Sequence, residues 1–374
     1  MTNYVWFKGF FRKKIRKLFL SFLSNNIVVF LRYLFISIMI RLYYKKWFIK
    51  VIGSYFILLQ VTIGFKQILA QNVEPGSVFS DTISKTSIKT LRCFVTGNEL
   101  SYPSIELRGA QTLTFMFDEL GTQANNYSYQ VVYCNSDWSV SDLFTDEFME
   151  GFAENPIQDY LFSINTTVPY VNYKVILPND EVQFKISGNY LFRVFENEHR
   201  DNIVLTKRFV VYEPLVGIEA TVSRALGDNL YQKGQQVNVK VIHNDFPIAD
   251  PYTEVKVFIS QNNSPGNLLT DIKPVFINNN EIDYQLPGKN VFMGGNEFRM
   301  FSFNDKTRFG INVIDVKYPD TFYHLQLRLD EPRNLKKYFW EEDLNGKYLV
   351  NLEKSDNSDE SADYAYVYFY LLMD

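Results

Sequence analysis

Residues 189–195 read NYLFRVF, and this stretch decides the fold class. Side chains along a strand point to opposite faces in turn, which places Tyr190, Phe192 and Val194 together on one face. The opposite face then carries Leu191, Arg193 and Phe195. An aromatic and β-branched run of this length predicts a β-strand.

Similar short runs recur along the chain and are separated by Asn, Asp, Gly and Pro residues. The high aromatic content, 17% of all residues, also favours strand-rich structure. This spacing predicts an all-β fold of tandem immunoglobulin-like or fibronectin-like antiparallel β-sandwich domains. The clearest runs are residues 88–96, 110–117, 127–134, 170–177 and 203–212.

The dipeptide Glu213-Pro214 marks a domain boundary, because Pro disfavours continuation of a hydrogen-bonded ladder. We predict a first β-sandwich domain at 86–213, with a short helix or ordered connection near its middle, and a second at 214–329. A third β-rich domain begins in 330–374. Its last strand, at 364–373, would leave a long apolar edge, so we expect this domain to be truncated.

Charge is distributed unevenly along the chain. Residues 1–71 contain 12 of the 38 Lys and Arg residues and none of the 42 Asp and Glu residues. The remainder therefore has a net charge of −16. An acidic body repels phosphate backbones, so we expect no nucleic-acid partner.

The basic leader has the organisation of a secretory signal peptide, predicted at residues 39–71. Basic residues at 41–50 precede a charge-free run of 15 residues, and the small residue Ala70 follows near a cleavage point. The run is shorter than the roughly 20 apolar residues of a membrane span. Residues 1–38 are either a mis-extended N-terminus, with Met39 as the true start, or a membrane segment.

The mature chain is expected to be exported to the periplasm and to begin with a linker at 72–85. No Cys lies directly after the cleavage region, so we expect no lipid anchor. Export permits a disulfide between Cys93 and Cys134, the only cysteines. The alternative is two buried thiols that act as small core residues.

Candidate catalytic and metal-binding residues do not form a pattern. His199, His243 and His324 are far apart, which favours surface or packed histidines over a metal site. Carboxylates such as Asp118-Glu119 are plentiful, but no pair is singled out for glycoside hydrolysis. The acidic stretch 353–361 is predicted to be a solvated loop. We therefore predict no catalytic residue, no metal, no cofactor and no small-molecule substrate.

Seven stretches form an ordered set along residues 133–348. In this order and spacing they resemble the plug protein family of the type IX secretion system of Bacteroidetes, over roughly residues 86–374. The family usually continues into a further β-sandwich portion. The stretches are YCNSDW (133–138), SINTT with two following tyrosines (163–173), LPN (177–179), SGNYLFRV (187–194), RFVV (208–211), GNEFR (295–299) and DLNGKY (343–348).

The resemblance implies a periplasmic, non-catalytic protein on the inner face of the outer membrane. Such a protein docks on a very large outer-membrane β-barrel translocon and closes its pore while no substrate is exported. Two other classes stay open. One is a carbohydrate-binding β-sandwich protein, and the other is a β-sandwich hydrolase with two facing carboxylates in a cleft.

The family-motif residues are interpreted as structural rather than as a binding site. Trp138 is expected to anchor the sandwich core, and Gly188 and Asn189 to shape the turn into a strand. Glu297 and Arg299 alternate with Phe298 and are expected to bridge neighbouring strands. The full set is Cys134, Trp138, Asn165, Ser187, Gly188, Asn189, Tyr190, Arg193, Asn296, Glu297, Phe298 and Arg299.

Overall fold

The computed structural model describes the chain in ten stretches. The chain divides into two compact units, Met1–Trp6 with Phe79–Asp374, and Phe7–Val78. The signal peptide predicted at 39–71 lies outside the described residues, and within them no helix is long and apolar enough to cross a membrane. The described stretches are residues 4–7, 81–196, 199–225, 234–244, 246–262, 267–294, 298–303, 310–332, 342–352 and 357–372.

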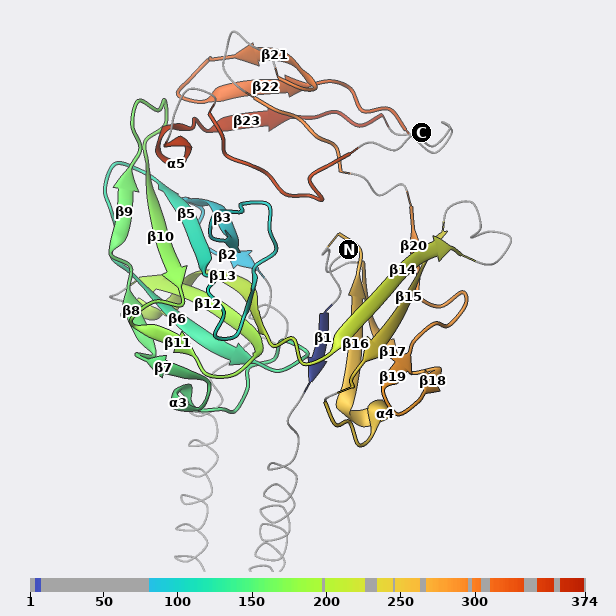
Figure 1. Ribbon diagram of the computed structural model, residues 1–374. Coiled ribbons are helices and arrows are strands. Elements are labelled where there is room, and N and C mark those ends of the chain that lie inside the picture. Colours follow the sequence, from blue (N-terminus) through green and yellow to red (C-terminus); the bar gives the residue numbers. More distant parts are fainter. Residues whose placement is uncertain are drawn as a thin grey trace, which may run out of the picture. The chain divides into compact units, whose positions relative to one another are not determined.

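One layer of the first sandwich is a four-stranded antiparallel sheet (Figure 1). Its order β3-β5-β10-β9 places β5 in the interior, with Phe117 of β5 opposite Tyr173 of β10. The sheet contains β3 (Ile88–Val95), β5 (Leu113–Leu120), β9 (Asp159–Phe162) and β10 (Tyr170–Leu177).

The second layer has the strand order β2-β13-β12-β6-β8, and β4 pairs parallel to β13. Its strands are β2 (Thr82–Ile83), β4 (Ser104–Glu106), β6 (Tyr127–Cys134), β8 (Glu154–Pro156), β12 (Gly188–Glu196) and β13 (His199–Tyr212).

Strand β2 lies inside the stretch 72–85 that was predicted as a linker. The hydroxyls of Thr82 and Thr206 are 2.8 Å apart, and Asp81 accepts a hydrogen bond from the Arg208 amide at 2.8 Å. A strand of two residues has no periodicity to read, so only its partner in β13 identifies it.

Aromatic rings fill the space between the two layers. Phe115 stacks on Phe192 with ring centroids 4.3 Å apart, and Tyr190 stacks on Phe209 at 5.3 Å. Tyr190, Phe192 and Val194 have no exposed surface, so the face that they were predicted to share is the core face. Large stacked rings bury much apolar area in fixed geometries and so give the sandwich a rigid interior.

One end of the first sandwich is covered by α3 (Thr145–Phe148) and by the pair β7 (Met149–Gly151) and β11 (Val182–Phe184). The helix occupies four residues of the connection in which a short helix was expected. Gly151 is required in this pair, because a Cβ at its position would lie 1.7 Å from the Glu181 carbonyl oxygen.

The second set of strands forms a five-stranded and a three-stranded sheet. The orders are β14-β15-β19-β18, with β20 on β15, and β1-β16-β17. Alternate residues of β15 and β16 are buried, namely Val237, Val239, Val241, Val255, Val257 and Ile259. The elements are β1 (Tyr4–Phe7), β14 (Gly217–Arg224), β15 (Gly234–Ile242), α4 (Pro251–Glu254), β16 (Val255–Ser260), β17 (Leu268–Ile272), β18 (Phe276–Ile277), β19 (Glu281–Asp283) and β20 (Val291–Met293).

The last sheet contains β21 (Val313–Lys317), β22 (Tyr323–Leu327) and β23 (Ala365–Tyr368), with β23 parallel to β22. A short helix, α5 (Ser358–Ser361), precedes β23. β21 and β22 fall within 214–329, the predicted second domain, yet pair with a strand of the predicted third. The prediction of an all-β fold with antiparallel sandwiches is confirmed.

Candidate functional site

The outward face of the β3-β5-β10 sheet carries polar side chains that are nevertheless buried. Core-facing Phe115 and Phe117 alternate with outward Met116 and Asp118 along β5, and Asn172 of β10 lies opposite Asp118. Asp118 is 5% exposed and Asn172 is 4% exposed. Polar groups on the outside of a sandwich are buried only where another part of the chain covers them.

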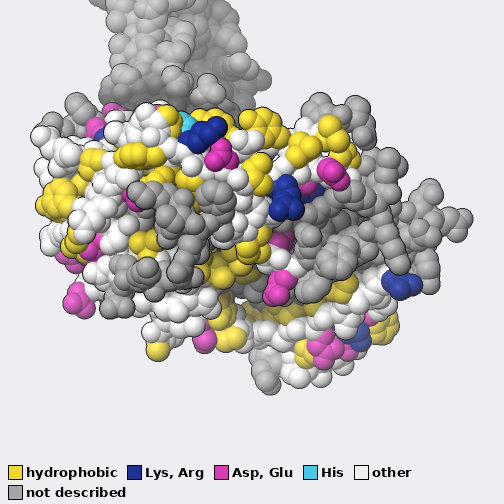
Figure 2. All heavy atoms as spheres, turned by 90° about the horizontal axis from the view of Figure 1, so that it is seen from above, with side chains coloured by type: hydrophobic (Ala, Val, Ile, Leu, Met, Phe, Trp, Pro, Cys, Tyr) yellow, Lys and Arg dark blue, Asp and Glu magenta, His cyan; other side chains and the backbone are white. Residues whose placement is uncertain are grey.

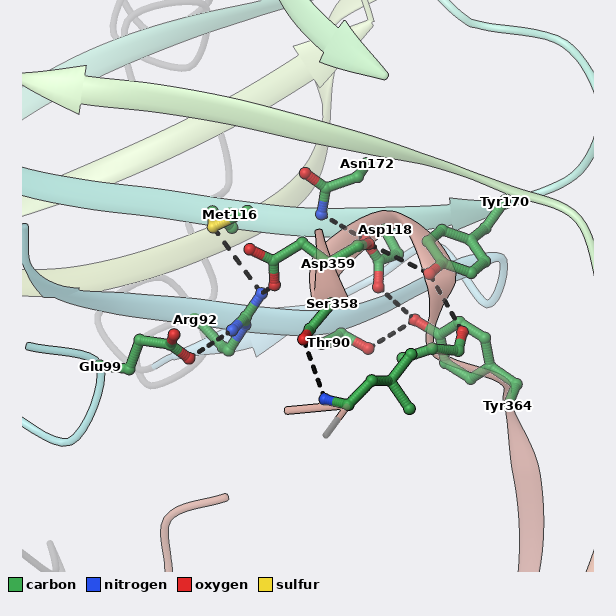
Figure 3. Close-up of polar contacts among 12 residues, drawn as sticks. Thr90, Arg92, Glu99, Met116, Asp118, Tyr170, Asn172, Ser358, Asp359 and Tyr364 are labelled. Atoms are coloured by element: carbon green, nitrogen blue, oxygen red, sulfur yellow. Dashed lines mark hydrogen bonds and ion pairs between the residues drawn. The ribbon is translucent and has the colours of Figure 1, made fainter. Parts of the chain in front are cut away.

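The covering element is residues 358–364, which comprise α5 and the three residues after it; we call them the docked segment (Figure 3). The Arg92 guanidinium forms an ion pair with the Asp359 carboxylate, and a second one with Glu99 at 3.0 Å. Arg92 is only 7% exposed. Opposite charges held close to each other at a buried position attract more strongly than they would in water.

Asp118 is held by two side-chain donors. Asn172 Nδ2 and the Tyr364 hydroxyl donate to its two carboxylate oxygens, each at 2.6 Å (Figure 3). Thr90 Oγ1 lies 2.5 Å from the same Tyr364 hydroxyl and completes the chain of hydrogen bonds. Burial raises the pKa of Asp118, and the hydrogen bonds from Tyr364 and Asn172 offset this rise only in part.

The backbone of the docked segment is also bound. The Ile164 amide donates to the Glu360 carbonyl oxygen at 2.7 Å, and the Thr167 amide donates to the Asp363 carboxylate at 2.6 Å. The Tyr170 hydroxyl lies 3.1 and 3.0 Å from the carbonyl oxygens of Asp359 and Ala362. We call the outward side chains that receive the segment the polar face; its members are Thr90, Arg92, Asp118, Tyr170 and Asn172.

A second ionic cluster joins the two layers of the first sandwich. Lys85 Nζ lies 2.7 Å from both Glu119 and Glu196 and donates to the Tyr127 hydroxyl at 2.8 Å. Burial disfavours the charged amine, but the hydrogen bonds to the two carboxylates outweigh it and raise the pKa of Lys85. The contacts are mutually satisfied, which gives this cluster a structural role.

The two cysteines are free buried thiols in the structure. Cys93 of β3 faces the core, whereas Cys134 of β6 lies on the outward side of the other layer with Val132 and Leu191. Burial raises the pKa of Cys134 to about 11 and also raises the pKa of Cys93. This arrangement corresponds to the second of the two alternatives drawn from the sequence.

Trp138 lies on the outward side of the β13-β12-β6 layer and not in the core between the layers, where it was expected. It packs on Val132 and Leu191, and the Arg208 guanidinium lies 4.7 Å from its ring centroid. Its backbone has a φ of +66°, which belongs to a turn after β6. The amphipathic indole therefore covers a smaller buried cluster beside two cationic residues, Arg193 and Arg208.

The motif at 187–190 has a local structural explanation. A Cβ on Gly188 would lie 2.4 Å from the Tyr133 ring, whose hydroxyl donates to the Ser187 carbonyl oxygen at 3.0 Å. Asn189 Nδ2 donates to the Asn135 carbonyl oxygen at 3.0 Å. The Tyr190 hydroxyl donates to the Ile186 carbonyl oxygen at 2.6 Å, and Asn165 has a φ of +58° in a turn.

The motif at 296–299 is described only in its second half, because Asn296 and Glu297 lie outside the described residues. The Phe298 amide donates to Asp343 at 2.5 Å, and Arg299 Nε donates to Asp330 at 2.6 Å. Neither Phe298 nor Arg299 lies in a strand, and the Glu297 part of the expected bridge lies outside the described residues.

Among the described residues, no group of three or more His, Cys, Asp or Glu side chains is arranged to hold a metal ion. His243 Nδ1 lies 3.2 Å from the Phe246 carbonyl oxygen, and His324 contacts Asp320 and Tyr368. The side chain of His199 lies outside the described residues.

The described residues expose many large hydrophobic side chains, and two sets of them are runs of three or more consecutive residues. Figure 2 shows many of them on the face seen from above, interspersed with charged side chains. Residues 160–162 of β9 form one set. The other set follows β23 and includes Phe369, which is 67% exposed, with Tyr370, Leu371 and Leu372. Exposed clusters of this kind are typical of surfaces that bind other macromolecules.

Sequence reasoning missed the polar face and its occupant. Arg92 and Asp359 are 267 residues apart, and the stretch 353–361 was expected to be solvated. One signal was present: Asp118-Glu119 stands inside the otherwise apolar strand LTFMFDEL, and a carboxylate in such a strand needs a partner.

The fold and the site define a β-sandwich protein that carries polar and hydrophobic contact surfaces on its described part. A family model for the first domain of the type 9 secretion system plug protein matches residues 88–213. The solved structures include a hypothetical protein from Parabacteroides merdae, 36% identical, with a TM-score of 0.76 over 79% of this chain and 75% of that one. No curated protein matches.

The chain belongs to the type 9 secretion system plug protein family. This membership connects it with type IX secretion and confirms the family resemblance found in the sequence. The matched residues span β3 to β13, which is nearly all of the first sandwich.

Proposed function

We propose that the chain is a non-catalytic periplasmic plug, which docks on the outer-membrane β-barrel translocon of type IX secretion and closes its pore while no substrate is exported. The observation that carries this proposal is the family match over the first sandwich. A signal peptide at 39–71 would deliver the chain to the periplasmic side of the outer membrane.

The physical demands of a plug agree with the first sandwich. A pore is blocked sterically, so the blocking body must keep its shape, and stacked rings such as Phe115 on Phe192 make the interior rigid. A plug must also leave the pore, so its interface is expected to be moderate in size and partly hydrated. The exposed aromatic and aliphatic sets at β9 and after β23 supply anchors for such an interface.

The first test is recovery of the partner. Tagged full-length chain, exported in its own host, is used to pull down proteins from solubilised outer membranes, with and without ongoing cargo export. We expect a very large β-barrel protein to be recovered, and less of it while cargo is moving. The variants Leu161→Asp and Phe369→Asp each add one charge to one exposed hydrophobic set and identify which set contacts the barrel.

The second test is leakage through the pore. Cells without the chain are expected to admit a large hydrophilic dye across the outer membrane, and deletion of the barrel as well should remove the leak. An intact permeability barrier, with no barrel in the pull-down and retention of the chain on a polysaccharide column, would overturn the proposal and favour carbohydrate binding.

A further inference from the structure

The docked segment is held in the manner of a bound peptide. Every described contact that attaches it to the first sandwich joins residues far apart in the sequence, such as Asp118 with Tyr364. Two of its carboxylates, Asp359 and Asp363, are four residues apart, and each has its own donor on the sandwich. The donors are the Arg92 guanidinium and the Thr167 amide and hydroxyl.

The segment has no hydrophobic core of its own. None of the four residues of α5 is buried, and the only ring contact that it makes with the polar face is between Tyr364 and Tyr170, with centroids 5.3 Å apart. Departure of the segment would expose a polar face and not the aromatic interior, which lies on the opposite side of the sheet. The first sandwich can therefore release this segment without losing the interactions that fold it.

The polar face keeps capacity for an anionic ligand. Arg92 is nine-tenths buried, has carboxylate partners at two nitrogens, and leaves its Nε without a hydrogen-bond partner among the described residues. Asp118 requires a donor at the same place, which the Tyr364 hydroxyl supplies. These requirements together specify a peptide of the pattern Asp-x-x-x-Asp-Tyr. The guanidinium selects the first carboxylate, the free backbone amide selects the second, and the buried carboxyl selects the tyrosine hydroxyl.

We propose that the polar face is a binding site for an acidic peptide of this pattern, filled in the resting chain by Asp359–Tyr364 and opened to an acidic segment of another protein by exchange. The inference stands on the contacts of this chain and does not depend on the plug function. The tethered occupant acts at an effective concentration of the order of millimolar, so it excludes weak competitors and yields to tighter ones.

The test uses full-length chain and a fluorescent, end-blocked peptide of residues 357–365, NSDESADYA. The open variant, Asp359→Asn with Asp363→Asn, weakens the internal occupant. The control, Glu342→Gln with Glu360→Gln, removes two charges as well, from side chains with no hydrogen bond or ion pair among the described residues. Fluorescence anisotropy measures peptide binding, with chain concentrations up to the millimolar range.

The open variant is expected to bind the peptide at least tenfold more tightly than the wild type and the control. A peptide with both aspartates changed to asparagine should bind at least tenfold more weakly, as should the labelled peptide when Arg92→Met is added to the open variant. Equal binding of the two peptides, or no gain in the open variant, would overturn the proposal.

A second measurement guards against variants that are merely misfolded. Hydrogen exchange of the Ile164 and Thr167 amides, which donate to the docked segment, should accelerate in the open variant and not in the control. The amides of β5 should stay protected in both. Unchanged exchange at Ile164 and Thr167 would show that the carboxylates do not hold the segment, and would also overturn the proposal.

Discussion

The Tyr364 hydroxyl connects the docked segment to Asp118, the buried carboxyl of the polar face. It donates to Asp118 at 2.6 Å and lies 2.5 Å from Thr90 Oγ1. The substitution Tyr364→Phe removes this oxygen and keeps the ring that packs on Tyr170. The change therefore tests the hydrogen bonds without a change of shape.

The expected magnitude follows from the burial of the acceptor. Asp118 is 5% exposed and has two side-chain donors, so water does not readily replace the lost hydroxyl. Loss of one such hydrogen bond costs about 1–3 kcal/mol. At about 1.4 kcal/mol for each factor of ten, the ratio of docked to open segment should fall about 5-fold to 150-fold.

Native-state hydrogen exchange measures this ratio directly. The amides of Ile164 and Thr167 donate to Glu360 and Asp363 of the docked segment, so they exchange when the segment opens. When closing is faster than exchange, the observed rate is proportional to the open population. Both amides should therefore exchange faster in Tyr364→Phe by the factor given above.

The matched control is Tyr366→Phe. Tyr366 is half exposed on β23, two residues further along the chain, and its ring contacts Phe322 and His324. Loss of its hydroxyl should leave the Ile164 and Thr167 amides unchanged. Exchange within twofold of the wild type in Tyr364→Phe, or equal acceleration in both variants, would refute the reasoning.

Three further predictions concern the first sandwich and its buried groups. Phe192→Ala should lower the free energy of unfolding in urea by about 3–5 kcal/mol, whereas Phe369→Ala should change it by less than about 0.5 kcal/mol. Burial raises the pKa of Asp118, so the docked form holds a proton more tightly than the open form does. Protection of the Ile164 and Thr167 amides against hydrogen exchange should therefore increase as the pH falls through that pKa. The substitution Asp118→Asn should remove this dependence. Cys93 and Cys134 should react with a thiol reagent only after denaturation.

Each of these predictions has an outcome that contradicts it. Equal destabilisation by the two phenylalanine substitutions would mean that the aromatic stack is not the core. A pH dependence retained in Asp118→Asn would assign it to another group. Mass spectrometry without reduction that finds Cys93 joined to Cys134 would contradict the arrangement of the two thiols on different faces.

Local alternation was sufficient to predict the long strands of the first sandwich and which side chains of β12 share a face. Tyr190, Phe192 and Val194 were assigned to one face, and that face is the aromatic core. The same alternation did not show that the opposite face, with Leu191, is buried as well. Trp138 covers that face, and a turn residue with a positive φ cannot be placed by a period of two.

The candidate site could not be predicted in the same way, because it depends on the meeting of distant segments. An acidic stretch such as 353–361 is usually exposed to solvent, and nothing in its sequence identifies Arg92 as its partner. The informative residue was Asp118, since a carboxyl in an apolar strand demands a donor from elsewhere. A buried carboxyl therefore predicts that a hydrogen-bond donor lies beside it, but it does not predict which residue supplies that donor.

The polar face is formed before the segment that covers it has been synthesised. A ribosome makes the chain from its N-terminus, and all strands of the first sandwich are present once β13 ends at Tyr212. The docked segment begins at residue 358, so the polar face of the newly made sandwich stays uncovered until well over a hundred further residues have been added. A face made largely of polar side chains such as Arg92, Asp118 and Asn172 tolerates that delay, because water solvates it and it offers neighbouring chains little apolar surface.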